Sequence, residues 1–175
     1  MVSDGGSPSQ VIMRPVEAGD LAAISELHAR AFGPGRYTRT AYRIREGTGA
    51  FSPYCRVCLI DGRLVAAVRF TEISIGGKGA ALLLGPLAVD PAFANQGYGR
   101  SLVANALEDA RDARIALVVL VGDEPYYGRL GFRRIPVGKI TLPGPVNPSR
   151  LLATELVPDA LTTYTGLIAA DAARA

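Results

Sequence analysis

The stretch DPAFANQGYGRSLVANAL, residues 90–107, decides the fold of this chain. Two glycines, Gly97 and Gly99, join a preceding apolar run to a segment with helical periodicity. A helix N-terminus exposes unpaired backbone N–H groups and carries a partial positive charge. Glycines remove the Cβ atoms that would block a ligand. The stretch therefore indicates an anion-binding helix start, with a tight turn between loop and helix as the structural alternative. The apolar positions that predict the helix are Leu102, Val103, Ala106, Leu107 and Ala110.

Two other phosphate-binding motifs do not fit. The dinucleotide fingerprint needs a third small residue where this chain has Leu102, which is too large for close packing of helix on strand. The P-loop needs a lysine after its second glycine, and here Arg100 and Ser101 follow Gly99.

The flanking segments predict a sheet. Residues 81–89 read as a strand before the glycine turn and residues 114–122 as a buried strand after the helix, so the unit is a right-handed crossover between parallel strands. Upstream, residues 55–61 and 63–75 flank an Asp61-Gly62 turn, a strong hairpin signal. Residues 11–16 add a strand, and residues 18–32 and 36–46 read as helices. We expect residues 149–161 to close the sheet and residues 169–175 to fray.

Composition and length favour one globular domain over residues 1–175, with residues 1–9 as a flexible tail. The net charge of +3 suits an anionic ligand but is too small to indicate nucleic acid. No apolar run is long enough to span a membrane, and the N-terminal residues have no signal-peptide pattern. We therefore expect a cytoplasmic protein without a membrane or nucleic-acid partner.

Cys55 and Cys58 have the C-x-x-C spacing of a metal or redox site. The chain has no second cysteine pair and a single histidine, His28, so Cys and His alone cannot fill a four-ligand zinc site. On a strand, residues three apart point to opposite faces. We interpret both as ordinary thiols and expect no metal.

The stretch LLLGPLAVDPAFANQGYGRSLVANAL resembles the acetyl-CoA-binding core of the GNAT-type N-acetyltransferases. That family carries an L-x-V-x-P strand end followed by [QR]-x-x-G-x-[GA] and a helix. The segment YYGRLGF is similar to the family's Y-x-x-x-G-F segment. The matching core spans about residues 81–135. The family's Gln or Arg falls on Ala94 here, so we expect backbone donors to hold the ligand, with Asn95 capping the helix.

The resemblance implies an α+β fold with a mixed central sheet, an antiparallel meander and one parallel crossover. It implies acetyl-CoA as co-substrate, with backbone groups of Leu87, Ala88 and Val89 along the thioester and Asn95, Gln96, Gly97, Tyr98, Gly99, Arg100 and Ser101 around the pyrophosphate. Pro86 cannot donate to a ladder, so Gly85-Pro86 predicts a bulge or an unpaired edge that leaves N–H groups open.

The resemblance also implies a mechanism, in which Tyr127 is the general acid that protonates the departing thiolate. Tyr126 is then an aromatic residue at the edge of the core. We assign no general base: Glu72, Glu124 and His28 are candidates, and a water relay or an amine that has lost its proton would also serve.

The acceptor is a small-molecule or protein amine, and the chain is a monomer or a homodimer. A non-catalytic acyl-CoA-binding or sensing module and an interaction domain that binds no CoA are the alternatives.

Arg36, Arg39 and Arg43 fall at helical spacing and share one face of the second predicted helix. If this helix walls the acceptor site, as in the GNAT fold, these side chains favour an acceptor with a carboxylate or phosphate. A solvated basic face is the alternative, and we prefer it slightly.

Overall fold

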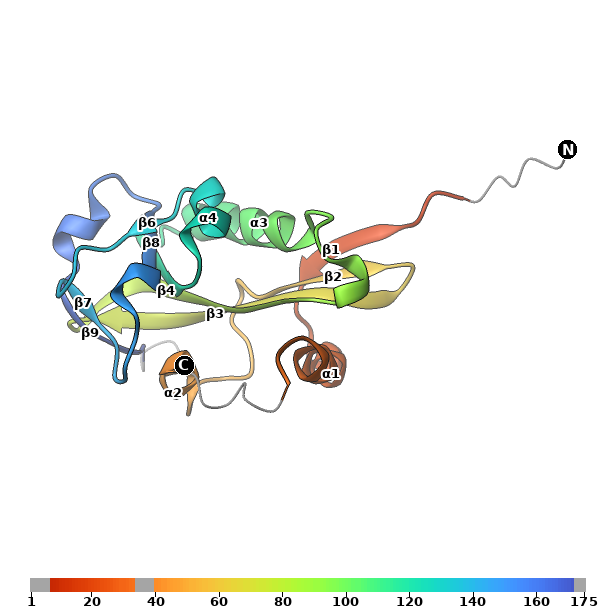
Figure 1. Ribbon diagram of the computed structural model, residues 1–175, viewed down its shortest axis with the longest axis horizontal. Coiled ribbons are helices and arrows are strands. Elements are labelled where there is room, and N and C mark those ends of the chain that lie inside the picture. The colour runs from red at the N-terminus through yellow and green to blue at the C-terminus, as the bar shows by residue number, and fades with distance from the viewer. Residues whose placement is uncertain (1–6, 34–39, 172–175) are drawn as a thin grey trace, which may run out of the picture.

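The computed structural model describes residues 7–33 and 40–171, and for residues 40–42 it describes the backbone only. One sheet organises these residues, with helices on both of its faces (Figure 1). The strands on the main path follow the order β1-β2-β3-β4-β5-β8-β6. They are β1 (Val11–Pro15), β2 (Arg56–Ile60), β3 (Arg63–Ile75), β4 (Lys78–Val89), β5 (Leu117–Val121), β8 (Leu151–Glu155) and β6 (Arg133–Arg134).

The first four strands form the predicted antiparallel meander. Residues 61 and 62 turn β2 into β3 with left-handed backbones, at φ 48° for Asp61 and 80° for Gly62, as a two-residue hairpin requires. β1 pairs with β2, and β3 pairs with β4. The hairpin prediction is therefore confirmed.

The crossover prediction is also confirmed. β4 leads through the short helix η3 (Pro91–Phe93) into α3 (Tyr98–Asp112), and α3 leads into β5, which pairs with β4 in parallel. The side chains of α3 that the sequence places on one face are all buried against the sheet: Leu102, Val103, Ala106, Leu107 and Ala110.

The last third of the chain differs from the expectation. β8 does not close the sheet, because β6 pairs with its outer side and β8 lies between β5 and β6. Residues 169 and 170 do not fray. They belong to β9 (Gly166–Ala170), which pairs with Ile73–Ile75 of β3. β3 is longer than β2 and leaves that edge open, so β9 completes it. β7 (Ile140–Thr141) pairs with β9.

The helices lie in two layers. α1 (Leu21–Phe32), preceded by η1 (Ala18–Asp20), and α2 (Thr40–Arg45) lie on one side of the sheet, and α3 and α4 (Glu124–Tyr127) lie on the other (Figure 1). Three further short 3-10 turns lie in the described part of the chain: η4 (Gly128–Leu130), η5 (Pro148–Arg150) and η6 (Ala160–Thr163). Cys55 packs in the α1-side core and Cys58 in the α3-side core, so the two buried thiols face opposite sides of the sheet, as predicted.

Candidate active site

A bulge in β4 opens the sheet next to α3. Val68 of β3 pairs with Leu87 of β4, whereas Phe70 pairs with Leu84, so Gly85 and Pro86 together face a single residue of β3. β5 pairs with β4 only at residues 81–83, so β4 parts from β5 as it reaches the bulge. The predicted bulge and unpaired edge at Gly85-Pro86 are confirmed.

The direction of the β4 amides follows from strand alternation. The N–H of Asp90 donates to the carbonyl of Val65 in β3 at 2.8 Å. Because successive amides of a strand point to opposite edges, the N–H of Ala88 also points toward β3. The amides of Leu87 and Val89 point the other way, into the edge that β5 leaves. The sequence leads us to expect backbone groups of Leu87, Ala88 and Val89 along the thioester. Leu87 and Val89 fit this expectation, whereas the Ala88 amide points into the sheet.

Gly97, and not Asn95, stands at the start of α3. Gly97 is the N-cap with a left-handed φ of 87°, and as a glycine it has no side chain to cap the helix. The expectation that Asn95 caps the helix is wrong, because the chain turns through two left-handed residues, Asn95 at φ 60° and then Gly97. The N–H of Ser101 donates to the Gly97 carbonyl, so the open amides of the helix start precede Ser101.

A pocket of about 380 Å³ surrounds this helix start. It contains seven of the ten residues predicted to bind the cofactor, and Leu87, Ala88 and Ser101 do not line it. Two arginines, Arg100 and Arg129, face it, and none of the described residues that line it is acidic. It therefore favours an anion. The full lining is Val89, Phe93, Ala94, Asn95, Gln96, Gly97, Tyr98, Gly99, Arg100, Tyr126 and Arg129.

Gly99 of α3 packs against side chains of β4 and α4. A Cβ at this position would lie 2.9 Å from the Tyr126 hydroxyl and 3.2 Å from Cγ2 of Val89. A Cβ at Gly97 would meet nothing within 4 Å. The two glycines therefore have different roles: Gly97 supplies a left-handed backbone, and Gly99 supplies room for Tyr126 and the strand.

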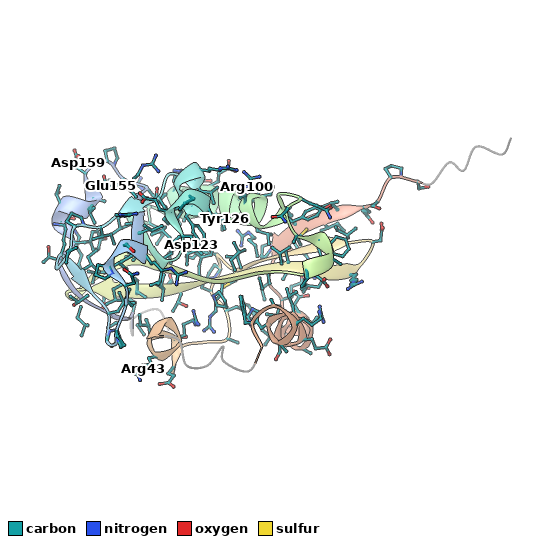
Figure 2. All side chains as sticks on the ribbon, viewed as in Figure 1. Arg43, Arg100, Asp123, Tyr126, Glu155 and Asp159 are labelled. Atoms are coloured by element: carbon teal, nitrogen blue, oxygen red, sulfur yellow. The ribbon has the colours of Figure 1, made fainter. Side chains whose placement is uncertain are left out.

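The two tyrosines of α4 differ in their surroundings. The ring of Tyr127 packs on Gly122 and, edge-on, on Phe132 at 5.9 Å between ring centroids. Burial raises the pKa of Tyr127 to about 12. Tyr126 is 39% exposed, and Figure 2 shows it near Arg100 of α3. It lines the pocket at the start of α3, with its hydroxyl close to Gly99. Burial raises the pKa of Tyr126 as well, while nearby Arg100 lowers it. Sequence reasoning placed Tyr126 at the core edge and missed its place in this pocket.

Asp90 ties the end of β4 to the elements around it. Its carboxylate accepts hydrogen bonds from the Ala92 amide at 3.0 Å and from Arg63 at 2.9 Å, and it lies 3.6 Å from Arg30 of α1. Although Asp90 is only 4% exposed, the Ala92 amide, with the two arginines, lowers its pKa. The carboxylate therefore fixes the segment that leads from β4 into α3.

A second pocket, of about 220 Å³, lies on the α1 side of the sheet. His28, Arg45, Phe51, Arg69 and Pro86 are among its lining residues. Pro86 belongs to the bulge, and Arg45 donates to the Gly85 carbonyl at 2.8 Å, so this pocket reaches the bulge from the side opposite α3.

The remaining candidates lie elsewhere. Arg36 and Arg39 lie outside the described residues, and Arg43 is exposed and does not line the second pocket. Glu124 forms an ion pair with Arg134 at 2.7 Å, and Glu72 lines a smaller pocket beyond Arg69.

Within residues 7–33 and 40–171, no helix is long and apolar enough to cross a membrane. The same residues contain no group of three or more His, Cys, Asp or Glu side chains that could hold a metal ion.

A sheet opened by a β4 bulge beside a helix start with open backbone amides is an architecture found in CoA-dependent acyltransferases. Residues 21–132 match the model of the acetyltransferase (GNAT) family, and because this match covers more than half of the chain, the chain belongs to that family. The predicted α+β fold class and family are confirmed.

Two Escherichia coli K12 proteins are similar in sequence. The uncharacterized N-acetyltransferase YhbS is 28% identical over 151 residues, which cover 85% of this chain and 89% of the relative. The uncharacterized N-acetyltransferase YjhQ is 28% identical over 116 residues, covering 65% of this chain and 64% of the relative.

Two solved structures are similar in fold. The E. coli YhbS structure in complex with CoA has a TM-score of 0.81 and 26% identity, covering 95% of this chain and 92% of that chain. A GNAT family acetyltransferase from Brucella melitensis in complex with acetyl-CoA has a TM-score of 0.71 and 26% identity, covering 94% and 97%.

Proposed function

We propose that this protein transfers the acetyl group of acetyl-CoA to a primary amine, with the CoA bound between the β4 edge and the start of α3. One observation carries the proposal. The bulge at Gly85-Pro86 opens β4 toward the start of α3 on one side of the sheet and toward a second pocket on the other. The acetyl donor, acetyl-CoA, and the acceptor amine can therefore meet at the bulge from opposite sides of the sheet.

The pyrophosphate is assigned to the start of α3. The amides from Gly97 to Arg100 precede the first intrahelical bond, and helix N-termini favour anions through such amides and through the helix dipole. Arg100 and Arg129 add two positive charges to the same pocket. Because Gly97 leaves the space around its Cα open, an anion can approach its backbone. The described residues thus fit the phosphates of CoA without the family's Gln or Arg at position 94.

The thioester is assigned to the edge of β4. When bound, acetyl-CoA supplies an activated acyl group with a good leaving group. The Leu87 and Val89 amides point into the opened edge, where one can hold the pantetheine and the other can donate to the acetyl oxygen. A donor placed where negative charge develops lowers the barrier to acyl transfer.

Tyr127 is the proposed general acid. Its ring is fixed by Gly122 and Phe132, and with a pKa raised to about 12 its phenol is protonated at neutral pH, as any tyrosine is, so it has a proton to donate. Tyr126 contacts Tyr127 edge-on at 4.8 Å between centroids, with its hydroxyl toward the α3 pocket. Tyr126 is therefore proposed to bind the cofactor. We assign no general base.

Calorimetry with CoA, followed by an assay of free thiol release from acetyl-CoA with a panel of amines, tests the proposal. Binding of CoA together with amine-dependent thiol release is the expected result. Binding without thiol release for any amine would indicate the non-catalytic acyl-CoA module. Failure to bind CoA would contradict the proposal itself.

A further inference from the structure

The lining of the second pocket, on the α1 side of the sheet and here called the α1-side pocket, indicates which class of acceptor it can bind. Its walls come from α1, from α2 and the segment after it, from β3, and from Pro86 in the bulge. Because Pro86 directly precedes Leu87, the pocket reaches the point to which the thioester is assigned. An amine in this pocket would approach the β4 edge from the side opposite the cofactor. This inference rests on the proposed function and concerns the substrate class of the same site.

The charge of the pocket has one sign. Arg45 reaches it from α2 and Arg69 from β3, and none of the described residues that line it is Asp or Glu. Both guanidinium groups are held in place: Arg45 donates to the Gly85 carbonyl at 2.8 Å, and Arg69 donates to the Thr48 hydroxyl at 2.9 Å. Glu72 lies beyond Arg69, in the neighbouring pocket. An acceptor with a second positive charge would therefore face two like charges in a partly dehydrated site.

The rest of the lining is mostly apolar. Ile24 and Phe32 of α1, Phe51 and Val68 supply hydrocarbon walls, and the cavity holds about 220 Å³. A cavity of this size and lining can take a short apolar body. Arginine holds carboxylates in a planar, charge-assisted geometry that a lone ammonium group cannot reproduce.

We propose that the acceptor is a primary amine that carries a carboxylate on a short apolar body, with the carboxylate at Arg45 and Arg69. Polycationic amines are rejected by the same arginines. These are other arginines than the face of Arg36, Arg39 and Arg43 considered from the sequence. Arg43 of that face is exposed on the outer side of α2 (Figure 2), in agreement with the preferred interpretation of a solvated basic face.

Matched amines test the proposal. L-leucine and L-leucinamide share one apolar body, and an uncharged amide replaces the carboxylate in the second. L-phenylalanine and 2-phenylethylamine differ in the presence of the carboxylate, and spermidine is a polycation. Because the carboxylate also changes the pKa of the amine, rates are compared at equal concentrations of unprotonated amine. In steady-state assays with acetyl-CoA, we expect kcat/KM to be about tenfold to a hundredfold higher for each carboxylated amine than for its partner, the range of one charge-assisted hydrogen bond. Spermidine should be the poorest acceptor.

Variants assign the preference to the pocket. Arg69→Gln should raise KM for L-leucine and remove most of its advantage over L-leucinamide, while KM for acetyl-CoA stays unchanged. Arg69→Lys, which keeps the charge but not the planar fork, should retain part of that advantage. Arg43→Gln removes the same charge from the exposed side of α2 and should change neither quantity. Thermal unfolding of each variant checks that it folds.

Three results would overturn the proposal: spermidine or the neutral amines reacting as well as the carboxylated ones, no acetylation of either amino acid by a protein that binds CoA, or an unchanged preference in Arg69→Gln and Arg69→Lys. A protein that fails to bind CoA in calorimetry would contradict the proposed function instead.

Discussion

Replacing Gly99 by alanine tests the close approach of α3 to β4 and α4. The new Cβ would lie 2.9 Å from the Tyr126 hydroxyl, 3.2 Å from Cγ2 of Val89 and 3.5 Å from Cδ2 of Leu87. The distance to Leu87 is an ordinary contact, and Val89 must shift by only a few tenths of an ångström. The 2.9 Å approach to the Tyr126 hydroxyl cannot persist, so this hydroxyl must move. Tyr126 lines the pocket at the start of α3, to which the cofactor is assigned.

Two opposing effects determine how much Gly99→Ala changes the free energy of unfolding. Overpacking costs about 1–3 kcal/mol, and the low end applies because the nearest atom is the tip of a half-exposed side chain. Alanine instead of glycine in a helix gains up to about 1 kcal/mol, and less in the first turn. We therefore expect Gly99→Ala to lower the free energy of unfolding by only about 0.5 kcal/mol. The displaced Tyr126 should weaken CoA binding by about tenfold, which corresponds to about 1.4 kcal/mol.

A double-mutant cycle isolates the contact. In a Tyr126→Phe background the hydroxyl is gone, so Gly99→Ala should destabilise less, with a coupling of at least about 0.5 kcal/mol in urea unfolding. Gly97→Ala is the matched control. It strains a backbone at φ 87° but meets no atom within 4 Å, so its effect should add to that of Tyr126→Phe. If Gly99→Ala and Tyr126→Phe add within about 0.3 kcal/mol, the described packing of Tyr126 on Gly99 is refuted.

Two further predictions concern proton donors and charge. Tyr127→Phe should lower kcat by about a hundredfold or more with the affinity for CoA unchanged, whereas Tyr126→Phe should mainly weaken the affinity for CoA. Stopped-flow kinetics measures kcat for both variants, and calorimetry measures their affinity for CoA. If chemistry is rate-limiting and Tyr127→Phe has the kcat of the wild type, Tyr127 is not the general acid. Asp90→Asn should lower the free energy of unfolding by about 2 kcal/mol at pH 7. Because the folded pKa of Asp90 is depressed, this stabilisation is present above the unfolded pKa of about 3.9 and is lost as pH falls through the folded pKa. In urea unfolding, the free energy of unfolding of the wild type should exceed that of Asp90→Asn by the same amount at pH 7 and pH 5.5. The two free energies should converge in more acidic solution. A difference between them that is the same at every pH would contradict the role of the Asp90 charge.

The sequence predicts the parts of this fold that local patterns control. The Asp61-Gly62 turn needs left-handed backbones, the α3 face repeats at helical spacing, and Pro86 cannot serve as a ladder donor, so hairpin, helix and bulge are all foreseen. The sequence does not predict that β9 returns to β3, since that pairing depends on an edge left open by the unequal lengths of β2 and β3. Gly166–Ala170 carries no local signal that points to Ile73–Ile75.

The candidate site divides in the same way. The glycine turn places Gln96 to Arg100 in the pocket correctly, because those residues are contiguous in sequence. Tyr126 of α4, Arg129 of η4 and Arg63 of β3, which pairs with Asp90, come from other elements, so only the packing of these elements reveals them. The direction of the Ala88 amide, away from the opened edge of β4, can be predicted only if the strand register is known. A one-residue shift would have exchanged the directions of Ala88 and Leu87.

The placement of the cofactor can be measured amide by amide. In a ¹H–¹⁵N NMR titration of the ¹⁵N-labelled protein with acetyl-CoA, the largest shifts should fall on the amides of Gly97, Tyr98, Gly99 and Arg100 and on those of Leu87 and Val89. The Ala88 amide, which points toward β3, should shift much less than its two neighbours. Saturable shifts confined to other regions, or no shift at the start of α3, would contradict the central claim that this helix start and the opened edge of β4 hold acetyl-CoA.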